Sequence, residues 1–131
     1  MNNTDLTKTK EVRKTATIDR ELAELKVDIA ALQGTRLPDN GSVKENNYTF
    51  YWQGLGINEP RLHGVGFAVK NKLVNLIQTP IAISERIISL RLYAKGGIIN
   101  IISAYAPTLA ALAEDKDMFY FLVFCDCYFH L

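Results

Sequence analysis

Two strongly β-prone segments that lie close together constrain the fold more than any other feature of the sequence. Arg86–Tyr93 (RIISLRLY) and Ile98–Tyr105 (IINIISAY) are rich in β-branched and aliphatic residues, which favour extended strands. Only Ala94-Lys95-Gly96-Gly97 separates them, and so short a connection joins antiparallel neighbours. The sequence therefore predicts a β-hairpin over 86–105, and the fold must contain an antiparallel sheet.

The first part of the chain predicts a helix followed by a strand. Ile18, Leu22 and Leu25 fall at i, i+4 and i+7 with charged residues between them, which indicates an amphipathic helix over about 12–26 with one buried stripe. A short apolar segment follows at 28–33. We expect a strand there that is covered on both of its faces.

Further signals complete the order of elements. Pro38–Gly41 predicts a loop, and the segments 48–52 and 64–70 predict strands. Pro107 and Thr108 are expected to open a last helix, with Thr108 as its N-cap. Its expected apolar face comprises Leu109, Leu112 and Phe119. This order favours a layered α/β or α+β domain over a helical bundle or a pure β-sandwich.

Length and charge limit the classes of protein that the chain can belong to. Its 131 residues suit one domain, because domains average about 150 residues. A net charge of +1 excludes a polybasic nucleic-acid binder but leaves a local basic patch open. No window reaches the roughly 18 apolar residues of a membrane-spanning helix, and the start lacks the apolar part of a signal peptide. We therefore expect an intracellular protein that is neither secreted nor associated with a membrane.

The two ends of the chain differ sharply in composition. Residues 1–12 are polar and predict a mobile arm, whereas Asp126 is the one charged side chain from Met118 to Leu131. An apolar tail of this kind has to pack on something or promotes self-association. The tail also contains Cys125, Cys127 and His130. These three candidates are too few and too crowded for the usual tetrahedral zinc site.

Three motifs carry a resemblance to a known family. They are AALQGTRL at Ala30–Leu37, HGVGFAV at His63–Val69 and SAYAPT at Ser103–Thr108. In this order they resemble the endonuclease/exonuclease/phosphatase superfamily, and within it the endonuclease domain of non-LTR (LINE-type) retrotransposons, a group that includes copies called craniofacial development protein 2-like. The resemblance covers about 13–120, and 121–131 reads as a divergent apolar tail.

The resemblance implies a fold, a chemistry and a set of site residues. The fold is a four-layer α/β/β/α sandwich, here truncated over 13–120 without its first strand and its C-terminal half. The chemistry is Mg²⁺-dependent hydrolysis of DNA phosphodiesters. The main metal-binding glutamate of the family falls at Gly34, so the ligand is missing. Gln33, Arg36 and Tyr105 match substrate-binding positions, and Tyr105 matches the tyrosine that contacts the scissile phosphate in the family.

Structural alternatives exist for each of these residues. Arg36 also suits a surface ion pair, and Tyr105 suits a half-buried tyrosine at a strand end. His63 more naturally begins a strand after a loop than serves as a base, because the family's catalytic histidine belongs to a Ser-Asp-His motif that this chain does not contain. The Trp-Asn strand end and the Gly-Asp-x-Asn motif of the family are also absent from the sequence.

Three hypotheses about function follow. In the first, the chain is an inactive fragment of a retrotransposon endonuclease, a pseudoenzyme that binds no Mg²⁺ and binds DNA weakly or not at all. Its Tyr105 is then non-functional, because catalytic residues that act as a unit lose their effect together. In the second, it is a non-catalytic module that binds nucleic acid or protein through the basic residues of 8–20 and Arg36. In the third, it is an active nuclease to which another chain supplies the missing groups. A nuclear location stays open, because the family acts on nuclear DNA.

Overall fold

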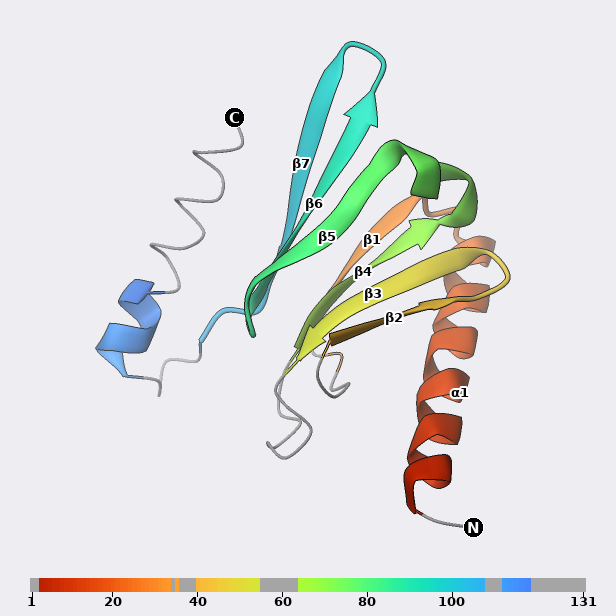
Figure 1. Ribbon diagram of the computed structural model, residues 1–131, viewed down its shortest axis with the longest axis horizontal. Coiled ribbons are helices and arrows are strands. Elements are labelled where there is room, and N and C mark those ends of the chain that lie inside the picture. Colours follow the sequence, from red (N-terminus) through yellow and green to blue (C-terminus); the bar gives the residue numbers. More distant parts are fainter. Residues whose placement is uncertain (1–2, 34, 36–39, 55–63, 108–111, 119–131) are drawn as a thin grey trace.

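In the described part of the chain, a long helix packs on the first of two antiparallel sheets (Figure 1). The computed structural model describes residues 3–33, 35, 40–54, 64–107 and 112–118. The elements are α1 (Asn3–Glu24), β1 (Ile29–Gln33), β2 (Asn40–Lys44), β3 (Tyr48–Gly54), β4 (Gly64–Lys70), the 3₁₀ helix η1 (Asn71–Leu76), β5 (Ile77–Ser84), β6 (Ile87–Ala94) and β7 (Gly97–Ala104). A short helical segment also covers 113–118.

The first sheet, sheet 1, has the strand order β1-β4-β3-β2, and all its neighbours are antiparallel. Its central strand β4 has the predicted bounds, and Gly64 through Val69 are all buried. Gly66 is needed in this strand, because a Cβ at that position would come within 2.3 Å of the carbonyl oxygen of Tyr51 on β3. The close approach of the two backbones explains why the motif GVGFAV carries a glycine in the middle of a strand.

The second sheet, sheet 2, has the order β5-β6-β7. The predicted hairpin is confirmed: β6 pairs with β7 from Ile87↔Ala104 to Ala94↔Gly97. The two-residue turn between them contains Gly96 with φ +103°, a backbone conformation that residues other than glycine rarely adopt. The hairpin end extends past sheet 1 (Figure 1), and Tyr93 and Ile98 are correspondingly exposed.

The main core lies between the two sheets. Val65, Phe67 and Val69 alternate along β4 and pack against Ile88 and Leu90 of β6. All five side chains are almost completely buried, and each such burial contributes about 1.5–3 kcal/mol. The alternation of these residues with a period of two is what places one whole face of β4 in this core.

A second core lies on the opposite face of sheet 1, where α1 packs. Tyr48, Phe50 and Ala68 contact the predicted helix positions Ile18 and Leu22. Helix, sheet 1 and sheet 2 therefore form three successive layers (Figure 1). The expectation of a layered fold that mixes helix and sheet is confirmed.

A buried carboxylate fixes α1 to the turn between β2 and β3. Asp19 is 2% exposed. Its Oδ1 accepts hydrogen bonds from the backbone N–H groups of Asn47 (3.1 Å) and Tyr48 (2.7 Å), and its Oδ2 accepts one from Asn47 Nδ2 (2.9 Å). These bonds satisfy the charge that burial would otherwise penalise.

Several expectations about the helix and the first strand were wrong. The helix begins at Asn3 instead of about residue 12, so the segment expected to be a polar arm is helical. Leu25 was expected on the buried stripe but is 73% exposed, because α1 ends at Glu24. The strand β1 is not covered on both faces: it forms an edge of sheet 1, and Ala31 and Gln33 are exposed.

Other corrections concern glycine and proline. Asn40 and Gly41 lie in β2 instead of a loop. Gly41 lies against the ring of Trp52, and a Cβ on residue 41 would come within 2.2 Å of an atom of that ring. The strand β5 was not expected. It tolerates Pro80 because β5 is an edge strand and its pairing with β6 skips from Gln78 to Ile81.

The last helix agrees only in part with the expectation. Residues 113–118 are helical, but Leu112, expected on the apolar face, is 69% exposed. Thr108, Leu109 and the tail 121–131 lie outside the described residues, and so do the predictions made for them. None of the helices in the described part of the chain combines the length and the apolar character that crossing a membrane requires.

Candidate functional site

The ends of β1 and β7 meet through a buried serine that joins the two sheets. Ser103, in β7, is 0% exposed. Its hydroxyl donates a hydrogen bond to the carbonyl oxygen of Leu32 (2.8 Å) and accepts one from Gln33 Nε2 (3.1 Å). Two of the three motifs identified in the sequence therefore contact each other, although they are far apart along the chain.

Tyr105 follows β7 directly and is held by Arg86. The Tyr105 backbone N–H donates to the Arg86 carbonyl oxygen (2.8 Å), and Arg86 Nη1 donates to the Tyr105 carbonyl oxygen (3.2 Å). The guanidinium carbon lies 5.8 Å from the centre of the Tyr105 ring, within the range of a cation–π contact. The ring itself is half-buried against the core between the sheets.

Thr35 continues the chain beyond β1 on the side that faces α1. It is 7% exposed, its N–H donates to the Gly64 carbonyl oxygen (3.4 Å), and its carbonyl oxygen accepts a hydrogen bond from Lys14 Nζ. The first motif is thereby tied both to β4 and to the helix. Gly34, Arg36 and His63 lie outside the described residues, so the roles predicted for them are not tested.

Of the predicted site residues, the structure brings Gln33 and the strand that leads to Tyr105 to the same end of the molecule. The sequence interpretation missed Ser103 and Arg86. The contact of Arg86 with Tyr105 could have been predicted from the sequence, because the predicted hairpin places these two strand ends opposite each other. Ser103 was not, because its partners belong to the other sheet.

The groups gathered at these strand ends do not suit a magnesium ion. Mg²⁺ is held by one or two carboxylates together with water, whereas the described side chains at these strand ends are the amide of Gln33, the hydroxyl of Ser103, the phenol of Tyr105 and the guanidinium of Arg86. Among the residues that the structure describes, no group of three histidine, cysteine or acidic side chains could hold a metal ion. The Ser103 hydroxyl and the Gln33 amide already hydrogen-bond within the protein, and the guanidinium of Arg86 is a group that suits an oxyanion better than a cation.

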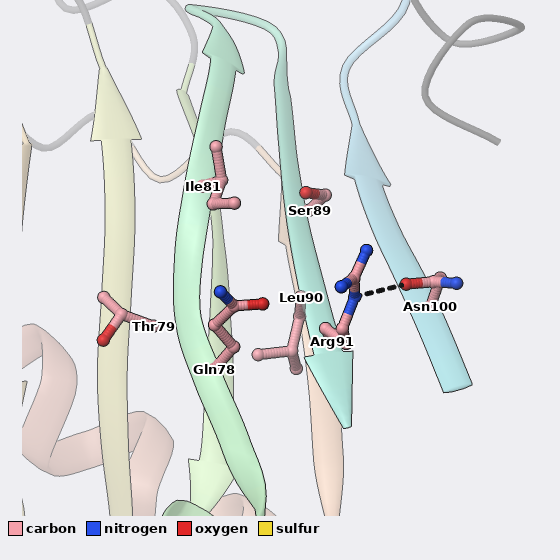
Figure 2. A pocket seen from close by; sticks show the side chains of 7 residues that line it. All are labelled: Gln78, Thr79, Ile81, Ser89, Leu90, Arg91 and Asn100. Carbon is pink, nitrogen blue, oxygen red and sulfur yellow. Dashed lines mark hydrogen bonds between the residues drawn. The ribbon is translucent and has the colours of Figure 1, made fainter. Parts of the chain in front are cut away.

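A hollow on the outer face of sheet 2 offers little for chemistry. Figure 2 shows its lining side chains, and its volume is about 150 Å³. Arg91 is its one charged lining residue, and Arg91 Nε donates to Asn100 Oδ1 across the β6–β7 pair (3.4 Å). The hollow is smaller than the ligand pockets of roughly 300 Å³ and above that proteins commonly use.

Comparisons with family models, with curated proteins and with solved structures found no match for this chain. Its function therefore has to be inferred from its residues and their arrangement.

Proposed function

We propose that the chain is a catalytically inactive fragment of a Mg²⁺-dependent DNA endonuclease of retrotransposon origin, with a partial α/β/β/α sandwich fold. One observation carries the proposal. The two motifs that surround the catalytic centre in the family it resembles, AALQGTRL and SAYAPT, meet through the hydrogen bonds of Ser103 to Leu32 and Gln33. The three layers formed by α1, sheet 1 and sheet 2 are compatible with part of such a sandwich.

The proposed loss of activity has a chemical basis in the same residues. The position of the metal-binding glutamate is Gly34, which has no side chain. Among the residues that the structure describes, Gln33, Ser103 and Tyr105 at the paired strand ends supply no carboxylate in its place. The sequence also lacks the Asp and His motifs that position and activate the attacking water in the family. Because such residues act as a unit, the remaining donors are expected to give no measurable hydrolysis.

A plasmid-nicking assay tests this proposal. Purified chain is incubated with supercoiled plasmid and Mg²⁺ or Mn²⁺, next to an active nuclease that shows the assay works. We expect no nicking above background, either for the natural chain or for Gly34→Glu, with Gly34→Gln as the uncharged control of equal length. Metal-dependent nicking by the natural chain would overturn the inactive assignment. Activity in Gly34→Glu alone would show that the other catalytic groups are present after all.

A second candidate function, a non-catalytic nucleic-acid binding module, is favoured by Arg86. Its guanidinium lies beside the Tyr105 ring at the end of β7, and a guanidinium suits a backbone phosphate. In a salt titration of DNA affinity, each phosphate contact contributes about −0.9 to the slope of log K against log salt. Arg86→Gln should reduce the slope by about one contact, whereas Arg91→Gln, on the outer face of sheet 2, should leave it unchanged. An absence of binding at low salt, or equal slopes in both variants, would exclude this function.

A further inference from the structure

The outer face of sheet 2, which points away from sheet 1, is largely apolar. Ile88 and Leu90 of β6 pack in the core between the sheets, so the residues that alternate with them point to the outer face. Figure 2 shows Ser89 and Arg91 among these residues. Together with their partners on β5 and β7, the apolar positions of this face are Ile81, Ile87, Tyr93, Ile98, Ile102 and Ala104.

The apolar side chains of the outer face differ in exposure. Ile98, Ile81 and Tyr93 are 53%, 48% and 46% exposed. Ile87 is 0% exposed, although it belongs to neither of the two described cores. Ile87 pairs with Ala104, so burial on the outer face begins where the chain leaves β7. A patch of large apolar side chains that is only partly covered usually marks a contact surface.

The chain itself leads toward this face. After β7 ends at Ala104, the helical segment 113–118 lies on the side of sheet 2 that faces away from sheet 1 and α1 (Figure 1). Thirteen more residues, 119–131, follow Met118 and lie outside the described residues. Even in the compact form of a helix, thirteen residues reach about 20 Å, whereas three neighbouring strands span about 10 Å. The segment 119–131 is therefore long enough to cross the outer face.

The charges of the segment and of the face are complementary. Arg91 is the single charged residue within β5, β6 and β7, and Asp126 is the single charged residue of 119–131. All residues of that segment other than Asp126 and His130 are hydrophobic. Arg91 Nε donates to Asn100 Oδ1, which is an uncharged acceptor. A hydrophobic cover over the guanidinium therefore needs a carboxylate, because a charge that loses its hydration without a countercharge is costly.

We propose that residues 119–131 of the same chain dock on the outer face of sheet 2, with Asp126 paired to Arg91. The hydrophobic side chains of the segment then cover the half-exposed apolar residues of the face. The outer face of a second copy is a poorer occupant, because it brings a second Arg91 against the first and leaves both without a countercharge. The docking is separate from the function proposed above, because Gln33 and Ser103 take no part in it.

Paramagnetic NMR on the full chain locates the segment. Cys125 and Cys127 are the two cysteines of the sequence, so a nitroxide on Cys127 in a Cys125→Ser background marks this segment alone. We expect the label to broaden the amide resonances of Tyr93 and Ile98 and to leave that of Glu21, an exposed residue of α1, unchanged. Broadening that is absent from the outer face, or equally strong at Glu21, would overturn the proposal.

A mixed sample identifies which copy supplies the segment. Isotope-labelled chain without nitroxide is combined with nitroxide-carrying chain without isotope label. We expect no broadening in this mixture. Broadening of the outer-face resonances that is as strong in the mixture as in the singly labelled chain would assign the face to the segment of a second copy and refute docking within one chain.

Charge reversal tests the pairing of Arg91 with Asp126. The rate at which the two cysteines react with a thiol reagent measures how often the segment leaves the face. Arg91→Asp brings two carboxylates together and should raise this rate at least about tenfold. Adding Asp126→Arg should return the rate to within about threefold of that of the natural chain. Lys95→Asp, in the exposed turn between β6 and β7, is the matched control and should leave the rate unchanged.

Two results would contradict the pairing. One is a reaction rate in Arg91→Asp that equals the rate in Lys95→Asp, and the other is a double reversal that reacts as fast as Arg91→Asp alone. The paramagnetic measurement keeps both charges in place, so it decides the docking by itself if Arg91→Asp does not fold.

Discussion

Replacing Asp19 with alanine should destabilise the chain by about 3 kcal/mol. The largest part comes from the backbone N–H of Tyr48, which donates to Asp19 Oδ1 at 2.7 Å in a residue that is 1% exposed. Without the carboxylate this donor is buried and unpaired, which costs about 1–3 kcal/mol. The two bonds from Asn47 add less, because Asn47 is exposed and water can replace the carboxylate there.

Urea denaturation measures this loss. With a slope of about 2 kcal/mol per molar urea, a loss of about 3 kcal/mol lowers the midpoint by about 1.5 M. Asp19→Asn keeps one acceptor oxygen for the Tyr48 N–H, so we expect it to lose only about half as much. Glu21→Ala is the control, because Glu21 lies on the same helix with an exposed side chain.

The size of the difference decides whether the hydrogen bonds of Asp19 matter. If Asp19→Ala unfolds within about 0.5 kcal/mol of Glu21→Ala, the carboxylate does not hold α1 against the turn, since exposed surface substitutions already fall in that range. An unchanged slope is required for this comparison, because a changed slope would indicate a different unfolded or native state.

Two more outcomes are expected from the same kind of measurement. Burial is the main cause that raises the pKa of the Tyr48 phenol above its ordinary value of 10.0, and the carboxylates of Asp19 and Asp28 raise it further. The unfolded chain therefore releases this proton at a lower pH than the folded chain does. The stability that is present below about pH 10 is then lost as the pH rises further. Urea midpoints between about pH 8 and pH 11 should fall less steeply in Tyr48→Phe than in the natural chain or in the exposed control Tyr93→Phe, and equal slopes would contradict the assignment. Ser103→Ala removes the hydroxyl that joins the two sheets and should cost about 1–3 kcal/mol; an unchanged midpoint would mean that this contact does not stabilise the fold.

The elements that the sequence predicted well are those with a local physical signature. The hairpin over 86–105 combines β-branched residues with a glycine turn, and β4 alternates apolar residues with the bounds 64–70. The elements that it missed depend on neighbours. Gly41 and Pro80 ordinarily interrupt strands, and both are tolerated here for tertiary reasons: the Trp52 ring occupies the space beside Gly41, and β5 is an edge strand with interrupted pairing at Pro80.

The same distinction applies to the site. The pairing of Arg86 with Tyr105 followed from the register of the hairpin and could have been predicted. The contacts of Ser103 depend on how sheet 2 sits against sheet 1, which no pattern along the chain encodes. The role of Asp19 could not be predicted from the sequence either, because an acidic residue between the apolar positions of a helix normally faces water.

Pro80 also limits how sheet 2 can grow. The outer edge of β5 is an edge of the sheet among the described residues, and an added strand would need an unbroken series of backbone donors there. Pro80 has no N–H to supply, and the register of β5 against β6 shifts between Gln78 and Ile81, around this residue. Among the described residues the opposite edge of sheet 2 is β7, whose eight residues from Gly97 to Ala104 include no proline, so the two edges of this sheet differ in the backbone donors that they contain.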